Sequence, residues 1–90
     1  MAEKRTRIDI IGDMLISVIN KGGHIKPTHL MYKSNLSYSQ LKSYLEELLS
    51  KEFVKITKNK NNKYVAITDK GRDFVNKLRE IKQFERAFGL

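Results

Sequence analysis

Apolar residues recur at intervals of three and four between residues 8 and 19, and this spacing predicts an amphipathic first helix. Thr6 is placed to cap that helix, and Asp9, three residues later, completes a box-like start. The glycine pair at 22–23 ends the helix, because glycine adopts the left-handed conformation at a helix C-terminus without strain. Residues 24–25 are expected to form a very short strand.

Two more helices, joined by a short turn, are predicted next. Pro27 suits the first turn of the second helix, which runs to about Lys33 with Leu30 and Met31 as its expected buried residues. The third helix is the best marked, because its start has the pattern of a capping box. The Ser37 hydroxyl can accept a hydrogen bond from the backbone amide of Gln40, and the Gln40 side chain can reach back to the backbone amide of Ser37. It extends to about Ser50, and its apolar stripe consists of Leu41, Tyr44, Leu45, Leu48 and Leu49.

From Phe53 onward the pattern changes to the alternation of a strand, with Val54 and Ile56 on one face. A polar turn at residues 59–62 leads to a returning strand over residues 64–67, so the two strands form a hairpin.

Thr68 is placed to cap a final helix that runs to about Phe88, with Gly71 as a weak spot in its first turn. The predicted fold class is mainly α with a small β-hairpin. The order of elements predicts a winged helix-turn-helix DNA-binding domain over residues 1–67, and residues 68–90 form a C-terminal helix for dimerisation.

Charge supports a nucleic-acid partner through its position as well as its amount. The chain carries 18 Lys and Arg against 10 Asp and Glu, for a net charge of +8. Residues 15–44 and 54–67 contain no acid. The N-terminus shows no signal-peptide pattern and no run of about 18 apolar residues occurs, so we expect a cytoplasmic, nucleoid-associated protein without a membrane partner. The chain has no cysteine, which excludes disulfides and thiolate metal sites.

The third helix is the expected recognition element, because an α-helix fits the major groove of B-DNA. Its N-terminal half offers groups that hydrogen-bond to bases or phosphates, although an ordinary solvated face is the alternative interpretation. Glu46 and Glu47 are expected to lie beyond the groove. The candidate DNA-reading residues are Ser37, Tyr38, Ser39, Gln40, Lys42 and Ser43.

The hairpin is the expected wing, since its lysines can attract phosphates without regard to base sequence. Lysine also protects hairpin edges from aggregation, which is the alternative interpretation. Candidate phosphate contacts in the hairpin are Lys58, Lys60, Asn61 and Lys63, and lesser candidates near the second helix are Thr28 and Lys33.

The final helix carries apolar residues at the spacing of a coiled-coil seam. This stripe either folds back on the core or pairs with another chain. We predict a homodimer, because a monomer of this size has little core with which to bury two phenylalanines near its end. The predicted dimerisation residues are Phe74, Leu78, Ile81, Phe84 and Phe88.

Nothing in the sequence points to catalysis, a cofactor, a metal or a small-molecule ligand. His24 and His29 have no cysteine or acid cluster with which to form a metal site. No Gly-rich phosphate loop is present, and no spacing suggests a catalytic triad. We therefore predict a binding protein rather than an enzyme.

Two short motifs add a resemblance to a known family. The run from Tyr32 to Tyr38 has the form Tyr-x-x-Asn-Leu-Ser-Tyr, and residues 68–71 have the form Thr-x-Lys-Gly. Over residues 8–78 the chain resembles the archaeal winged helix-turn-helix DNA-binding proteins that dimerise through a C-terminal coiled-coil helix. The resemblance implies a transcription regulator or a chromatin-associated protein that dimerises as an antiparallel coil.

Two further hypotheses remain beside duplex-DNA binding. A winged helix can also serve as a protein-interaction module within a larger assembly, with the apolar end of the last helix as the partner site. RNA binding lacks support because no aromatic stacking platform is evident, and Tyr38 and Tyr44 are expected to be core or turn residues.

Overall fold

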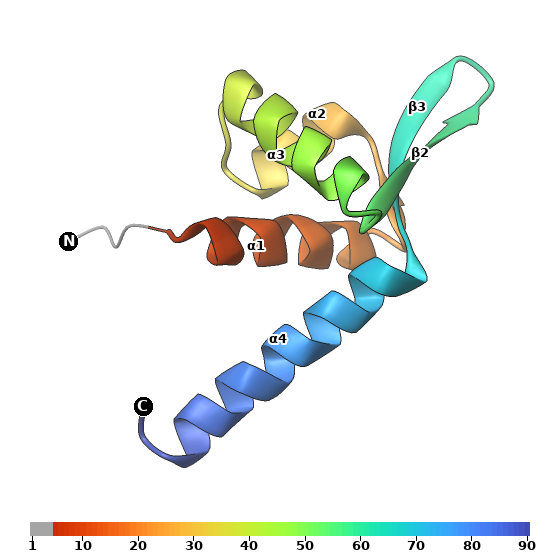
Figure 1. The fold of residues 1–90 in the computed structure, drawn as a ribbon. Helices are drawn as coiled ribbons and strands as arrows, with labels where there is room; N and C mark the ends of the chain where they lie inside the picture. The colour runs from red at the N-terminus through yellow and green to blue at the C-terminus, as the bar shows by residue number, and fades with distance from the viewer. Residues whose placement is uncertain (1–4) are drawn as a thin grey trace.

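The computed structural model describes residues 5–90, and within them the chain forms four helices and a three-stranded antiparallel sheet (Figure 1). This confirms the predicted fold class and the predicted order of elements. The elements are α1 (Arg7–Asn20), β1 (His24–Ile25), α2 (Pro27–Lys33), α3 (Tyr38–Ser50), β2 (Val54–Asn59), β3 (Asn62–Ile67) and α4 (Asp69–Ala87).

The first helix begins and ends where its local sequence predicts. The Asp9 amide donates to the Thr6 hydroxyl at 3.1 Å, and the Thr6 amide donates to the Asp9 carboxylate at 3.1 Å. The hydrogen bond from the Thr6 amide lowers the pKa of Asp9, because it stabilises the ionised carboxylate that completes the cap. Gly22 and Gly23 have φ of 90° and 99°, so the chain leaves α1 through a conformation that favours glycine.

The sheet has the strand order β1-β3-β2, so the central strand pairs with both neighbours. His24 in β1 lies opposite Ala66, a long-range pairing that extends the predicted hairpin to three strands. The hairpin turn is tighter than predicted, since Asn59 pairs with Asn62 and only Lys60 and Asn61 connect the strands. The returning strand therefore begins at Asn62 rather than Tyr64.

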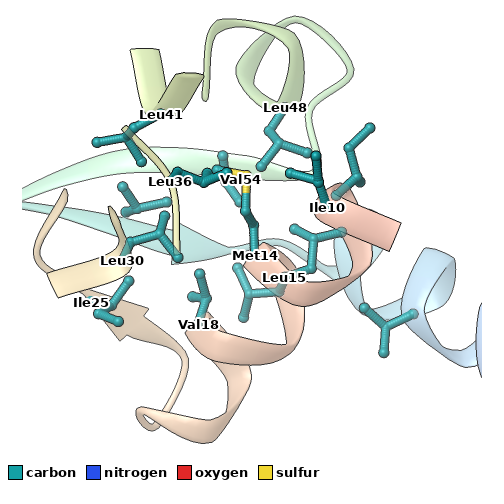
Figure 2. Close-up of a cluster of buried hydrophobic side chains, with 14 residues drawn as sticks. Ile10, Met14, Leu15, Val18, Ile25, Leu30, Leu36, Leu41, Leu48 and Val54 are labelled. Atoms are coloured by element: carbon teal, nitrogen blue, oxygen red, sulfur yellow. The ribbon is translucent and has the colours of Figure 1, made fainter. Parts of the chain in front are cut away.

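One hydrophobic core joins the helices to the inner face of the sheet. Met14 of α1 is fully buried and lies among side chains from α2, α3 and the sheet (Figure 2). Leu30 is buried as predicted, whereas Met31 is only partly buried against the cluster. The core fixes α3 over one face of the molecule and holds the base of the hairpin beside it (Figure 1).

The two halves of α4 have different surroundings. Val75 is buried, and Gly71 lies so close to the body that a Cβ atom there would be 2.2 Å from the carbonyl oxygen of Phe53. Gly71 was predicted only as a weak spot in the helix, but the close approach of backbone gives it a packing role. From Arg79 to Leu90 every residue is exposed. Within residues 5–90, no helix is both long enough and apolar enough to cross a membrane.

Candidate nucleic-acid interface

The N-terminus of α3 is held by the predicted capping box. The backbone amide of Ser37 donates to Oε1 of Gln40 at 2.9 Å, and the backbone amide of Gln40 donates to the Ser37 hydroxyl at 3.2 Å. A two-point contact of a glutamine with adenine uses both the oxygen and the nitrogen of its side-chain amide. Because the oxygen is part of the cap, such a contact requires the cap to open, whereas a single contact through the NH₂ group does not.

The rest of the predicted reading edge is open to solvent. Ser39, Lys42 and Ser43 are exposed on the side of α3 that faces away from the core. Tyr38 is 71% exposed as the first residue of the helix, so of the two places expected for it, the core or a turn, it does not lie in the core. Tyr44 is partly buried against the core. The difference follows from position along α3, since Tyr38 begins the helix one turn before the first buried residue, Leu41, whereas Tyr44 lies between the buried Leu41 and Leu48.

The two acids of α3 lie in its C-terminal half, as the sequence predicts, and one of them is paired. Glu47 forms an ion pair with Arg7 of α1, and Nε of Arg7 lies 3.1 Å from Oε1 of Glu47. Sequence reasoning missed this pair because it joins residues that are distant in the chain. The guanidinium offsets one negative charge near a surface that would otherwise repel phosphates. Glu46 remains exposed.

The wing, defined here as the β2–β3 hairpin over residues 54–67, carries its lysines on identifiable faces. Side chains alternate along a strand, so Lys58 and Lys63 share the face of Val54 and Val65, which packs on the helices. The wing extends past the helices, and the two lysines are exposed there (Figure 1). They are therefore on the side of the sheet where α3 also lies, whereas Lys55 is on the opposite face.

Lys58 and Lys63 are directly opposite each other in the strand register. Side chains paired in this way have Cβ atoms about 4.5–5.5 Å apart, and like charges at that separation destabilise a hairpin. Lys60, at the tip, has φ of 58°, a left-handed conformation that favours glycine or asparagine over lysine. A polyanion beside the wing would relieve the repulsion between the paired lysines.

The two lesser candidates on α2, Thr28 and Lys33, are both exposed, but they do not share a face. Five residues along a helix correspond to a rotation of about 140°. The turn after α2 is fixed by a contact that the sequence did not reveal, since Nη1 of Arg5 donates to the carbonyl oxygen of Ser34 at 2.7 Å.

The predicted dimerisation residues separate into two groups. Phe74 packs on Phe53 with ring centroids 4.8 Å apart, and Leu78 lies against Gly12 of α1, so these two contact their own chain. Ile81, Phe84 and Phe88 are 55%, 59% and 68% exposed. The rings of the two distal phenylalanines lie 4.7 Å apart and form one apolar surface.

Comparisons with known proteins agree with this architecture. Two uncharacterised proteins of Methanocaldococcus jannaschii are 33% and 31% identical to the chain over 78 residues. The chain spans 34% of the length of the first and 74% of the second.

Solved structures with a similar fold include Sso10a-2, a DNA-binding protein from Sulfolobus solfataricus. It has a TM-score of 0.76 and 21% identity over 93% of this chain and 85% of that one. A winged-helix DNA-binding protein from STIV has a TM-score of 0.73 and 18% identity over 91% and 92% of the two chains. The oxidized form of MarR from E. coli has a TM-score of 0.69 and 22% identity over 77% and 50%.

The decisive match is to a protein family rather than to one structure. Residues 4–86 match the winged helix-turn-helix family, which includes nearly the whole chain and every element described above. The chain therefore belongs to the winged helix-turn-helix family.

Proposed function

We propose that this protein binds double-stranded DNA, with α3 in the major groove and the wing on neighbouring phosphates or in the minor groove. The observation that carries the proposal is the placement of Lys58 and Lys63 on the α3 side of the sheet. A helix fits the major groove, and basic side chains beside it reach the sugar-phosphate backbone. Two of the proteins with a similar fold are DNA-binding proteins, which also supports this function.

The reading edge is suited to modest base discrimination. Serine hydroxyls and one lysine contact bases or phosphates singly, whereas strong discrimination usually comes from bidentate side chains. The main bidentate candidate, Gln40, already uses its oxygen in the helix cap. We therefore propose that contacts to the DNA sugar-phosphate backbone supply most of the affinity. The proposed role is that of a transcription regulator or an architectural protein of the nucleoid.

We further propose that the binding unit is a homodimer formed through α4. Ile81, Phe84 and Phe88 leave an apolar surface that their own chain does not cover. Pairing of this surface between two copies would remove it from water and present two α3 helices to one duplex. No catalytic step is part of the proposal.

The experiment is a titration of the protein with a random duplex and with the DNA upstream of its own gene, at several salt concentrations. Light scattering measures the mass in parallel. The proposal predicts binding that weakens steeply with salt. A preference of about a thousandfold for the upstream DNA indicates a regulator, and equal affinity indicates an architectural role.

The exposed apolar end of α4 also favours a second candidate, a protein-interaction module. No detectable binding to either duplex at low salt would contradict the DNA proposal and favour this second function.

A further inference from the structure

A basic hollow of about 390 Å³ lies between the C-terminal half of α1 and α2, and no residue of α3 lines it. Its floor includes the buried Ile25 of β1. Its rim carries polar and cationic groups from the two helices, namely Ser17, Asn20, Lys21, His29 and Lys33.

The charge around this hollow is one-sided. No carboxylate lines it, and among residues 5–90 neither Lys21 nor Lys33 has an acidic side chain within ion-pair distance. The nearest acid along α1 is Asp13, one turn before the hollow, and its carboxylate lies 3.1 Å from the guanidinium of Arg5. Two lysines, a histidine and an asparagine therefore line a space that has no carboxylate among its lining residues.

We propose that this hollow binds a phosphate group. A phosphate offers several acceptor oxygens, and ammonium, amide and imidazole N–H groups are its usual donors in proteins. The volume exceeds that of one phosphate, so the group can carry a sugar or a similar body that rests on Ile25. The phosphate comes either from a free phosphorylated metabolite or from the DNA backbone flanking the bound site.

The lysines also have a simpler role that the test must separate. Lys21 is the C-cap of α1, and Lys33 lies in the last turn of α2, where positive charge stabilises a helix through its dipole. A purely structural role predicts a loss of helix stability on substitution and no effect of phosphate. A phosphate site predicts a local, saturable response to phosphate that the substitution weakens.

The test compares the double variant Lys21→Gln/His29→Gln with the parent chain. Neither residue belongs to the proposed reading edge or wing. The matched control is Lys51→Gln/His24→Gln, because Lys51 is the C-cap of α3 and His24 contacts Tyr64 on the outer face of the sheet. Both variants lose one lysine and one histidine, so a general effect of charge is the same in the two proteins.

Backbone amide NMR shifts are followed during titration with sodium phosphate, against sodium chloride at equal ionic strength. They are followed again with a short duplex and with one longer by about one helical turn. One outcome is that free phosphate causes saturable shifts at residues 17–21 and 29–33. If the affinity for phosphate falls about tenfold in Lys21→Gln/His29→Gln and is retained in the control, the ligand is a free metabolite. Shifts at these residues with the longer duplex alone, weakened in the same variant, indicate DNA phosphate.

The proposal is overturned if neither probe shifts these residues, or if the two double variants respond alike. Free phosphate tests the hollow without DNA. If it does not bind, the proposal of duplex binding through α3 and the wing is unaffected.

Discussion

The wing and the distal end of α4, residues 79–90, both project beyond the packed core, and they extend toward opposite sides of the molecule (Figure 1). The wing tip is polar and basic, with a lysine pair on the α3 side. Distal α4 instead exposes Ile81, Phe84 and Phe88 among mixed charges. A basic surface is suited to phosphates, and an apolar surface is suited to another protein surface.

This contrast suggests that one small domain separates two kinds of contact. DNA is expected at one end and a second copy of the chain at the other. The core between them, which includes Met14 and Leu48, fixes where both projections begin. Substitutions in the wing should therefore weaken DNA binding and leave the dimer. Substitutions in distal α4 should break the dimer and leave the DNA contacts of each single domain, and a change where both projections are anchored should affect both.

The largest expected effect comes from Gly71→Ala, at the point where α4 leaves the sheet. The added Cβ would lie 2.2 Å from the carbonyl oxygen of Phe53, so backbone must move. We expect the free energy of unfolding to fall by about 3 kcal/mol, measured by urea denaturation, with DNA binding and dimer formation both weakened. The exposed control Asn76→Ala should change it by about 0.5 kcal/mol or less. Equal stability of the two variants would contradict the close packing at Gly71.

The next effect is on self-association. Phe84→Ser/Phe88→Ser should raise the dissociation constant of the dimer by about a hundredfold or more, because two exposed aromatic rings lose their partner surface. Analytical ultracentrifugation measures this change, and the far-UV circular dichroism should remain that of a folded protein. Tyr32→Ser, which removes an equally exposed ring from α2, serves as the control. Dimerisation by the double variant with parent affinity would contradict the α4 interface.

The wing should respond to charge rather than to apolar area. Lys58→Gln/Lys63→Gln is expected to weaken duplex binding by about tenfold to a hundredfold and to lower the salt slope by about two for each protomer bound. The hairpin itself should become slightly more stable, since the opposed like charges are removed. Lys55→Gln/Lys77→Gln removes the same charge from the outer face of the wing and from α4. If both double variants lower the slope equally, the lysines act through net charge and the proposed position of the wing is wrong.

The smallest expected change separates stability from binding at a single residue. Lys60 has a left-handed backbone, so Lys60→Gly should stabilise the protein by about 1 kcal/mol. The same change removes one phosphate contact and should lower the salt slope by about one. Thermal unfolding and a salt titration of the variant measure the two effects. If the variant is stabilised and the salt slope of DNA binding is unchanged, Lys60 does not contact DNA.

Local signals in the sequence predicted the helices well. The Ser37–Gln40 box and the Thr6–Asp9 box each depend on residues three positions apart, and both form as predicted. The exposed phenylalanines of distal α4 were also predictable, because a chain of 90 residues has a small core.

Long-range contacts were not predictable in this way. The pairing of β1 with β3 and the ion pair of Arg7 with Glu47 both join distant segments. The packing of Gly71 on Phe53 is also invisible in a local pattern, since a glycine inside a helix is read first as a weakness. Tyr38 shows the limit of residue type, because an aromatic side chain expected in the core or a turn is exposed at the first residue of α3.

The division of the chain into a DNA-binding domain over residues 1–67 and a dimerisation helix over residues 68–90 stays a prediction about function. Structurally, Phe74 and Val75 of α4 pack in the same core as α1 and β3. The variants of distal α4 therefore test the dimerisation role without removing residues that the fold requires.

The edge of α3 and the wing are proposed to contact the same duplex, and the backbone amide shifts on addition of a short DNA duplex test this. We expect the largest shifts at residues 37–43 and 58–63, with little change at residues 81–90. Largest shifts at the distal end of α4, or none in the wing, would contradict it.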